Sequence, residues 1–381
     1  MLQRRPVLFL TDRAPAADPS RALWPELVRA LERRGISATI SLPGAWRDHP
    51  ELLSRMPSLP GLRFRREQPW NPLRRILRRG SGEVAHAGML HPDSDLAVIW
   101  QAGPFDGHRI AEVCLDRGVP YLLVCGTPWE VDWPPDSRRE LLLRVFGGAL
   151  HTVFVSEYTR ERTCTLLATD LPRCSVLPAW HAAPVDPPEP WPASTGEWHL
   201  AHVGPALPVE SGIDLLFDVL GSDRWKSRPM RCTLYCWGPM NEWISQTIAA
   251  STSERIRLVP GIPDPKDVWP AVHGALYPCR RGSLVPEMLD AMGFARVPIT
   301  VAAGEISEVV HDGRNGFVSP AANRVCLSET IERAWECRGD GDRLGLAAAA
   351  TVRRMVPALQ VASGLADLIL DCLTATGSSL R

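Results

Sequence analysis

The stretch LYPCRRGSLVPEMLDAMGFARVPIT, residues 276–300, decides the fold of this chain. A short apolar strand at 275–277 leads into it, and a polar loop follows at 279–283. Apolar residues at helical spacing then predict a helix that carries Leu284 and Met292. A second apolar strand closes the stretch. A strand, a loop, a helix and a strand in this order are typical of an α/β protein with a parallel sheet.

Such a unit can bind an anion at the end of its first strand. Free backbone N–H groups and the positive end of the helix dipole point into the crevice there. Arginines in the loop can donate to phosphate, and carboxylates on the helix typically accept hydrogen bonds from ribose hydroxyls. The predicted nucleotide-binding residues of this stretch are Arg280, Arg281, Gly282, Ser283, Leu284, Glu287 and Asp290. The alternative is an ordinary charged strand–loop–helix unit, which every α/β protein contains.

The composition bounds the class of protein. A length of 381 residues predicts two or three domains, and a net charge of −1 argues against a general nucleic-acid partner. No apolar run reaches about 18 residues, so no transmembrane helix is expected. The ten cysteines are scattered and we interpret them as reduced thiols of a cytoplasmic protein, with no metal site.

The first half of the chain alternates strands and helices, which predicts a parallel sheet. The expected strands are 6–11, 36–42, 96–101, 120–125 and 152–156, and the expected helices are 19–34, 108–117 and 138–146.

Two loops of this half follow strands, at 103–107 and 126–135, and are rich in acids and indoles. Open α/β sheets bind ligands at this edge. Carboxylates accept hydrogen bonds from hydroxyl groups and indole rings cover apolar sugar faces, so the loops suit a polyhydroxyl ligand. The candidate residues are Asp106, Trp129, Glu130, Asp132 and Trp133. Ordinary loop packing with helix caps is the alternative.

A strongly basic segment lies between these strands. Residues 63–79 contain seven arginines with Trp70, and we consider them a candidate for peripheral contact with a membrane or an acidic acceptor. A solvated helix face is the commoner explanation of such a run.

A proline-dense stretch, 177–198, interrupts the periodicity and is typical of a semi-rigid connection between domains. A second series of alternating strands and helices follows it. The predicted organisation is a domain at 1–180, a linker at 181–198, a domain at 199–355 and a last helix at 356–381.

The order of motifs carries a family resemblance. VFVSEYTRE, HVGPALPVESGIDLL, LYCWGPM, LVPGIPDPKDVWPAV, the opening stretch and GEISEVVHDGRNGFVSP follow one another. In this order they resemble the retaining GT-B glycosyltransferases of the family 4-like group, also called group 1. The resemblance covers roughly residues 93–357.

The resemblance implies two Rossmann-like domains whose parallel sheets face across a cleft. The donor, a nucleoside-diphosphate sugar with UDP or GDP as the expected carrier, belongs in the C-terminal domain, and a sugar, glycolipid or natural-product acceptor in the N-terminal one. No metal or cofactor is required, and the final helix packs back on the N-terminal domain. The expected setting is cytoplasmic or at the inner membrane face, in cell-surface glycan or natural-product biosynthesis.

Further site residues follow from the resemblance. Backbone N–H groups at the strand ends support the nucleotide and the departing diphosphate, one acid steadies the last loop, and Asp106 or Glu130 orients the acceptor hydroxyl. The strand-end residues are Gly204, Gly238, Gly261, Gly304, Glu305 and Glu308.

The sequence also departs from the family pattern. Relatives carry two glutamates in the opening stretch, and the matching positions here are Gly282 and Asp290. Relatives carry an arginine and a lysine for the diphosphate, and the matching positions here are Pro205 and Ser211. The segment TDRAPAADP replaces the glycine-rich acceptor loop. Three hypotheses therefore stand: an active glycosyltransferase with a reworked donor site, a degenerate GT-B protein that binds without catalysis, or a GT-B enzyme of another class, such as an epimerase or phosphorylase.

Overall fold

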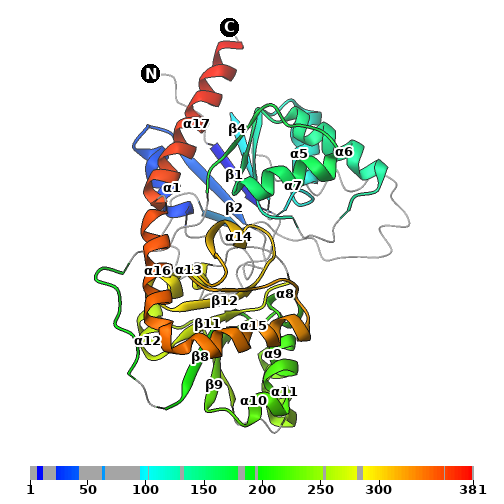
Figure 1. Cartoon of the computed structure of the whole chain (residues 1–381). Helices are drawn as coiled ribbons and strands as arrows, with labels where there is room; N and C mark the ends of the chain where they lie inside the picture. The colour runs from blue at the N-terminus through cyan, green and yellow to red at the C-terminus, as the bar shows by residue number, and fades with distance from the viewer. Residues whose placement is uncertain are drawn as a thin grey trace. The chain divides into compact units, whose positions relative to one another are not determined.

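The computed structural model describes residues 7–11, 23–42, 62–64, 95–101, 103–128, 133–178, 185–193, 196–251, 255–280, 286–355 and 357–379. The chain forms two compact units (Figure 1). Unit 1 comprises Met1–Ala179 and Ala358–Arg381, and unit 2 comprises Trp180–Pro357.

Unit 1 is built on a seven-stranded parallel sheet of order β3-β2-β1-β4-β5-β6-β7. The strands are β1 Val7–Thr11, β2 Ala38–Leu42, β3 Leu62–Phe64, β4 Leu96–Gln101, β5 Tyr121–Cys125, β6 His151–Phe154 and β7 Cys174–Val176. The helices are α1 Trp24–Glu32, α5 His108–Arg117, α6 Asp136–Gly148, α7 Glu157–Leu167 and α17 Ala358–Ser379.

Helices cover both faces of this sheet because its strands are apolar on both sides. Successive residues of a strand point to opposite faces, so Val7 and Phe9 pack toward α1 and α17, while Leu8 and Leu10 pack toward α5 and α6. Helix α17 contributes the buried Leu365 to the first of these cores. Its Asp367 accepts hydrogen bonds from Arg34, which follows α1 in the sequence.

Unit 2 is built on a six-stranded parallel sheet of order β10-β9-β8-β11-β12-β13. The strands are β8 Trp198–Pro205, β9 Met230–Trp237, β10 Ile256–Pro260, β11 Gly274–Tyr277, β12 Val297–Val301 and β13 Phe317–Ser319. The helices are α8 Pro208–Ser211, α9 Ile213–Leu220, α10 Asp223–Lys226, α11 Asn241–Ser251, α12 Pro265–Val268, η4 Trp269–Ala271, α13 Pro286–Gly293, α14 Ile306–Val309, α15 Arg324–Glu336, η5 Cys337–Asp340 and α16 Gly341–Arg354.

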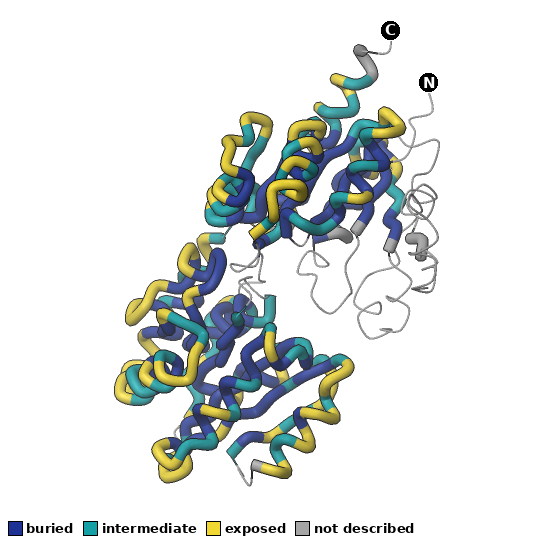
Figure 2. Tube along the Cα trace, turned by 90° about the vertical axis from the view of Figure 1, so that its right-hand side faces the viewer, coloured by how far each residue is buried: buried dark blue, intermediate teal, exposed yellow. Residues whose placement is uncertain are grey.

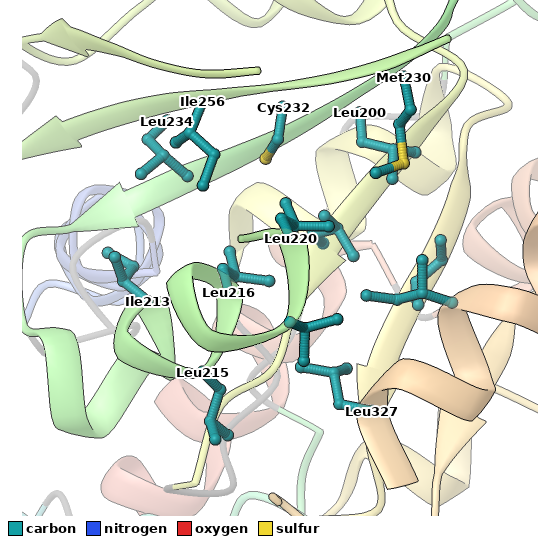
Figure 3. Close-up of a cluster of buried hydrophobic side chains, with 14 of the residues drawn as sticks. Leu200, Ile213, Leu215, Leu216, Leu220, Met230, Cys232, Leu234, Ile256 and Leu327 are labelled. Carbon is teal, nitrogen blue, oxygen red and sulfur yellow. The ribbon is translucent and has the colours of Figure 1, made fainter. Parts of the chain in front are cut away.

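The core of unit 2 also lies on both faces of its sheet. On one face, Leu200 and Leu234 of the strands meet Leu216 of α9 and Leu327 of α15 (Figure 3). On the other face, α13 and α16 cover the strands through residues such as Met288 and Val352. Figure 2 shows that the strands are buried in each unit and that exposed residues gather on the helices. The predicted α/β class with two Rossmann-like domains is therefore confirmed.

The proline-rich connection packs on unit 2. Trp191 stands edge-on to His273 and lies under the guanidinium of Arg296. A Cβ built at Gly341 or Gly345 of α16 would press against the Trp191 ring. The small residues of α16 thus leave a slot that this indole fills, which ties the connection to unit 2 at Trp191.

Candidate functional site

The strand order of unit 2 defines where a ligand can bind. β8 is the first strand of this sheet and β11 the fourth, yet they are neighbours. The chain leaves β8 toward one face of the sheet and β11 toward the other, because α9 packs on one core and α13 on the opposite one. A crevice therefore opens between the two strands at their carboxyl ends, which is the usual ligand site of such sheets.

β8 and β11 part toward this crevice. Their ladder joins Gly274 to Leu200 and Ala275 to Ala201, whereas β8 pairs with β9 along its whole length. Beyond the ladder, side chains connect them instead. His202 Nδ1 lies 2.8 Å from the Leu276 carbonyl oxygen, and the Tyr277 hydroxyl donates to the Val203 carbonyl at 3.1 Å.

Burial keeps both of these side chains uncharged. It lowers the pKa of His202 to about 4, so the ring is neutral and donates from Nδ1. It also raises the pKa of Tyr277 well above its usual range, and the carboxylates of Glu287 and Asp290 raise it further. The phenol therefore remains a donor at any physiological pH.

The effect on Tyr277 also locates the two acids of α13. Glu287 and Asp290 are both half-buried, and both act on the Tyr277 hydroxyl through space. Residues three apart share one face of a helix. Both carboxylates thus share one face of α13, and both are near enough to Tyr277 for their charges to raise its pKa.

The guanidinium of Arg280, a predicted nucleotide-binding residue, is paired with a carboxylate in this structure. Its guanidinium forms a two-pronged ion pair with Asp214, at 2.6 Å from Nη1 to Oδ1 and 2.7 Å from Nη2 to Oδ2. Nη1 also donates to the Val209 carbonyl at 2.9 Å. A carboxylate therefore occupies the fork of Arg280 in this structure, and the role of its guanidinium toward a phosphate stays a prediction. Arg281, Gly282, Ser283 and Leu284 lie outside the described residues.

The glycines predicted for the site lie at the same sheet edge. Gly204 is near the end of β8, and Gly238, Gly261 and Gly304 directly or closely follow β9, β10 and β12. The last three have positive φ angles, 112°, 108° and 57°, so each chain turns sharply as its strand ends. Gly261 is exposed and Gly238 half-buried, whereas Gly204 and Gly304 are buried.

The loop after β12 carries two acids with different exposures. Glu305 is buried, with 2% of its surface exposed, and its carbonyl accepts the N–H of Glu308 at 2.9 Å. The Glu308 side chain is exposed.

Pro205 and Ser211 stand at the two positions where relatives carry phosphate-binding cations, and both have structural roles here. Pro205 ends β8 and has no N–H to offer. The buried Ser211 hydroxyl donates to the Leu207 carbonyl at 2.7 Å, within the turn of α8. Neither side chain can replace a cation.

In unit 1 the switch point lies between β1 and β4. Asp106, half-buried in the loop after β4, is held by its backbone, because its carbonyl accepts from Gln101 Nε2 at 2.6 Å. Trp133 follows β5 in the chain and is 60% exposed, with the Arg162 guanidinium 4.7 Å above its ring centre. Trp129, Glu130 and Asp132 lie outside the described residues, as do 65–79 of the basic segment.

Sequence reasoning missed three residues of the switch point in unit 2: His202, Tyr277 and Asp214. Tyr277 was assigned only to a strand. A signal for the other two existed, since His202 interrupts an apolar strand just before Gly204, and Asp214 is an acid in the first turn of a helix, where the dipole favours it.

Metal sites and membrane-spanning helices are two further possibilities for the described residues. No group of three or more His, Cys, Asp or Glu side chains there could hold a metal ion. One helical stretch, Arg324–Thr376, contains a window long and apolar enough to cross a membrane. That stretch includes α17, whose Val361, Leu365 and Ile369 are buried in the core of unit 1.

Solved structures with the same architecture define the class of fold. HepE from Anabaena, solved with UDP and glucose, superposes with a TM-score of 0.68 at 14% identity over 96% of this chain and 100% of its own. Sucrose-phosphate synthase from Thermosynechococcus elongatus gives 0.73 at 13% identity over 98% and 100%. A TarM variant from S. aureus, solved with UDP and sugar ligands, gives 0.70 at 10% identity over 97% and 99%. The chain has the GT-B fold.

The sequence of unit 2 then indicates the family. Residues 198–337 match the family described as Glycosyl transferases group 1. This match spans all six strands of the second sheet and ends in η5, so it covers the whole switch-point crevice. No curated protein matches the chain.

Proposed function

We propose that this protein is a glycosyltransferase that moves a sugar from a nucleoside-diphosphate donor to a hydroxyl group of an acceptor. The observation that carries this proposal is the coincidence of the glycosyltransferase match at 198–337 with the switch point between β8 and β11. Unit 2 is then the donor domain and unit 1 the acceptor domain. Solved structures of the same fold with bound UDP or UDP-glucose support this class of donor.

In this proposal Asp290 accepts hydrogen bonds from the ribose hydroxyls, with Glu287 beside it. A carboxylate can accept two hydroxyl donors at once, and charged hydrogen bonds of this kind contribute about 1.5–3 kcal/mol each. Loop residues 281–284 and the strand-end glycines supply backbone N–H groups to the nucleotide. The loop of Gly304 and Glu305, steadied by Glu308, faces the donor sugar and its phosphates.

As the family resemblance implies, we propose that the transfer is metal-independent and that backbone dipoles stabilise the developing charge. The nucleoside diphosphate leaves from the face that the acceptor hydroxyl attacks, so the configuration of the sugar is retained. Asp106 or Glu130 orients the acceptor hydroxyl. Trp129, Asp132 and Trp133 form the acceptor surface, where an exposed indole can cover an apolar sugar face.

The finer assignments are part of the same proposal. The donor is a UDP- or GDP-hexose, and the acceptor is a sugar, a glycolipid or a natural product. The enzyme acts in the cytoplasm or at the inner face of the membrane, with residues 63–79 as the membrane contact. Its product belongs to a cell-surface glycan or a glycosylated natural product.

A thermal-shift screen against UDP, GDP, ADP, TDP and CDP tests the proposal. A nucleotide present at a hundred times its dissociation constant adds about 2.7 kcal/mol to the free energy of unfolding. One nucleotide is expected to raise the melting temperature clearly, and its sugar conjugate is then tested for slow hydrolysis in water. A folded sample that responds to none of the five contradicts the proposal.

One observation favours a second candidate, a GT-B protein that binds a ligand without catalysis. The family cations at 205 and 211 are replaced, and Arg280 is paired with Asp214. Such a protein is expected to bind a nucleoside diphosphate but to leave its sugar conjugate intact with every acceptor tested. Sugar release at any measurable rate, abolished by Asp290→Ala, decides for the enzyme.

A further inference from the structure

The Arg280–Asp214 pair joins the two sides of the switch-point crevice. Asp214 lies in the first turn of α9, which follows β8, and Arg280 follows β11. The two residues are 66 positions apart in sequence, yet two hydrogen bonds of 2.6 and 2.7 Å hold them in a fork-to-carboxylate geometry. Such a bidentate pair fixes direction as well as distance.

The backbone around the pair makes three further links between the same two loops. The Arg280 N–H donates to the Glu210 carbonyl at 3.0 Å, and its guanidinium donates to the Val209 carbonyl. Gly212 has a φ of 72°, and a Cβ built there would overlap the Pro278 carbonyl. The loop after β8 therefore touches the loop after β11 as closely as two backbones can.

These links occur where the sheet has few hydrogen bonds between β8 and β11. β8 and β11 share only a short ladder at their amino ends, so main-chain hydrogen bonds between strands do not fix the distance between the two loops. The pair is also only partly shielded, with 25% of the Arg280 side chain and 35% of the Asp214 side chain exposed. A partly exposed pair of this kind contributes modestly to stability, and its two-pronged geometry fixes how the two loops face each other.

We propose that the Arg280–Asp214 pair is a positioning pair that sets the separation of the two loops across the nucleotide crevice. It holds Arg280, which comes before α13 with Glu287 and Asp290 in the chain, against the loop that ends at Gly212. This inference rests on the proposed function, because it assigns the pair to the nucleoside diphosphate that the crevice binds. Arg280 acts through the loops and not as a phosphate ligand.

Calorimetric titration with UDP, or with GDP if the thermal-shift screen selects it, tests the pair. Arg280→Ala and Asp214→Ala are each expected to weaken binding about tenfold, the range typical of residues that support a binding group. The double variant is expected to lose no more than either single one, because both break the same link. Arg280→Lys keeps the charge but not the fork, and is expected to recover part of the loss.

The sign of the Asp214→Ala effect separates this role from direct phosphate binding. If Arg280 is instead a phosphate ligand, removal of Asp214 frees its guanidinium, and the diphosphate binds more tightly than it does to the wild-type protein. That outcome overturns the inference. Urea unfolding of each variant, with Arg280→Lys and Asp214→Asn as the milder changes, establishes that the titrated protein is folded.

Arg333→Ala is the matched control. Arg333 also donates both guanidinium Nη groups to one carboxylate, that of Asp312, at 2.6 and 3.1 Å. Arg333 lies in α15 and Asp312 in the segment before β13, away from the loops after β8 and β11. Its loss is expected to leave nucleotide affinity unchanged. If Arg280→Ala and Asp214→Ala both bind the nucleotide as tightly as the wild-type protein does, the inference is overturned and the proposed function stands. A folded wild-type protein that binds no nucleoside diphosphate overturns both.

Discussion

The two edges of the second sheet use similar residues for different purposes. At the carboxyl edge, polar side chains are partly exposed, as with the half-buried Glu287 and Asp290 of α13. At the amino edge, polar side chains are buried and paired with backbone carbonyls and neighbouring side chains. The His199 ring lies 3.1 Å from the Ala271 carbonyl and 2.9 Å from the Thr233 hydroxyl, and Arg296 is completely buried.

Arg296 shows the difference most clearly. It donates to the Trp269 carbonyl at 2.6 Å and to the Pro190 carbonyl at 2.8 Å, so it ties the proline-rich connection to the start of β12. Burial lowers its pKa to about 10, and it remains charged at neutral pH. An arginine at the amino edge is thus part of the core, whereas Arg280 at the carboxyl edge bridges two loops. Polar residues at the amino ends of the strands serve stability, and those at the carboxyl ends serve binding in the proposed function.

The largest expected effect is that of Arg296→Ala on stability. The change removes the donor from the buried Trp269 carbonyl and from the partly buried Pro190 carbonyl, and it leaves a gap beside Trp191. We therefore expect a loss of about 3–5 kcal/mol in the free energy of unfolding by urea. Arg338→Ala is the control, because its guanidinium lies 4.1 Å above the Trp335 ring on an exposed surface. That variant is expected to change stability by no more than about 0.5 kcal/mol. A loss in Arg296→Ala as small as in the control contradicts the contrast between the edges.

The pH dependence of stability is expected to be the next largest effect. Burial lowers the pKa of His199 and of His202 from 6.5 to about 4. The unfolded chain therefore takes up protons below about pH 6.5 that the folded protein refuses until about pH 4, and stability falls as pH falls through this window. Each histidine is expected to cost about 2 kcal/mol at pH 5 relative to pH 7.5.

Urea unfolding at the two pH values measures this loss in the wild-type protein and in His199→Gln. The variant cannot take up the proton, so its loss between pH 7.5 and pH 5 is expected to be smaller by the share of one histidine. A variant that loses as much stability as the wild type shows that His199 is protonated in the folded protein.

The third prediction concerns binding at the carboxyl edge. Asp290→Ala is expected to weaken nucleoside diphosphate binding by about 1.5–3 kcal/mol, the contribution of a charged hydrogen bond. Glu287→Ala is expected to weaken it far less, and both variants are expected to unfold within about 0.5 kcal/mol of the wild type. Equal losses of affinity in calorimetric titration mean that the register assigned to α13 is wrong.

A small effect on stability is expected for Trp133→Ala in unit 1. The indole is largely exposed and its contact with Arg162 is a surface cation–π pair, so the loss is expected to be about 0.5–1 kcal/mol. Acceptor use is expected to suffer instead, as a rise in KM for acceptor with little change for donor. A change confined to the donor KM contradicts the assignment of Trp133 to an acceptor surface.

Local sequence patterns predicted most of the regular structure. The strand at 96–101 and the helix at 108–117 have the predicted bounds, because apolar runs and a glycine stop are local signals. The prediction did not include α16, Gly341–Arg354, although its buried Leu344, Ala348 and Val352 lie at helical spacing. The helix predicted within residues 276–300 is α13, which begins at Pro286. Its predicted part at Leu284 lies outside the described residues.

The sequence by itself determined the alternation of strands and helices, the order of motifs and hence the GT-B class, since each depends on neighbouring residues and their periodicity. The tertiary structure alone decided which charges are available to a ligand. Arg280 and Arg296 look alike in the opening stretch, but one meets Asp214, 66 positions away, and the other meets the Pro190 carbonyl, 106 positions away. The crossing of the chain at the switch point and the packing of the proline-rich segment create those encounters. A side chain's partner is fixed by such long-range contacts, which periodicity along the chain does not encode.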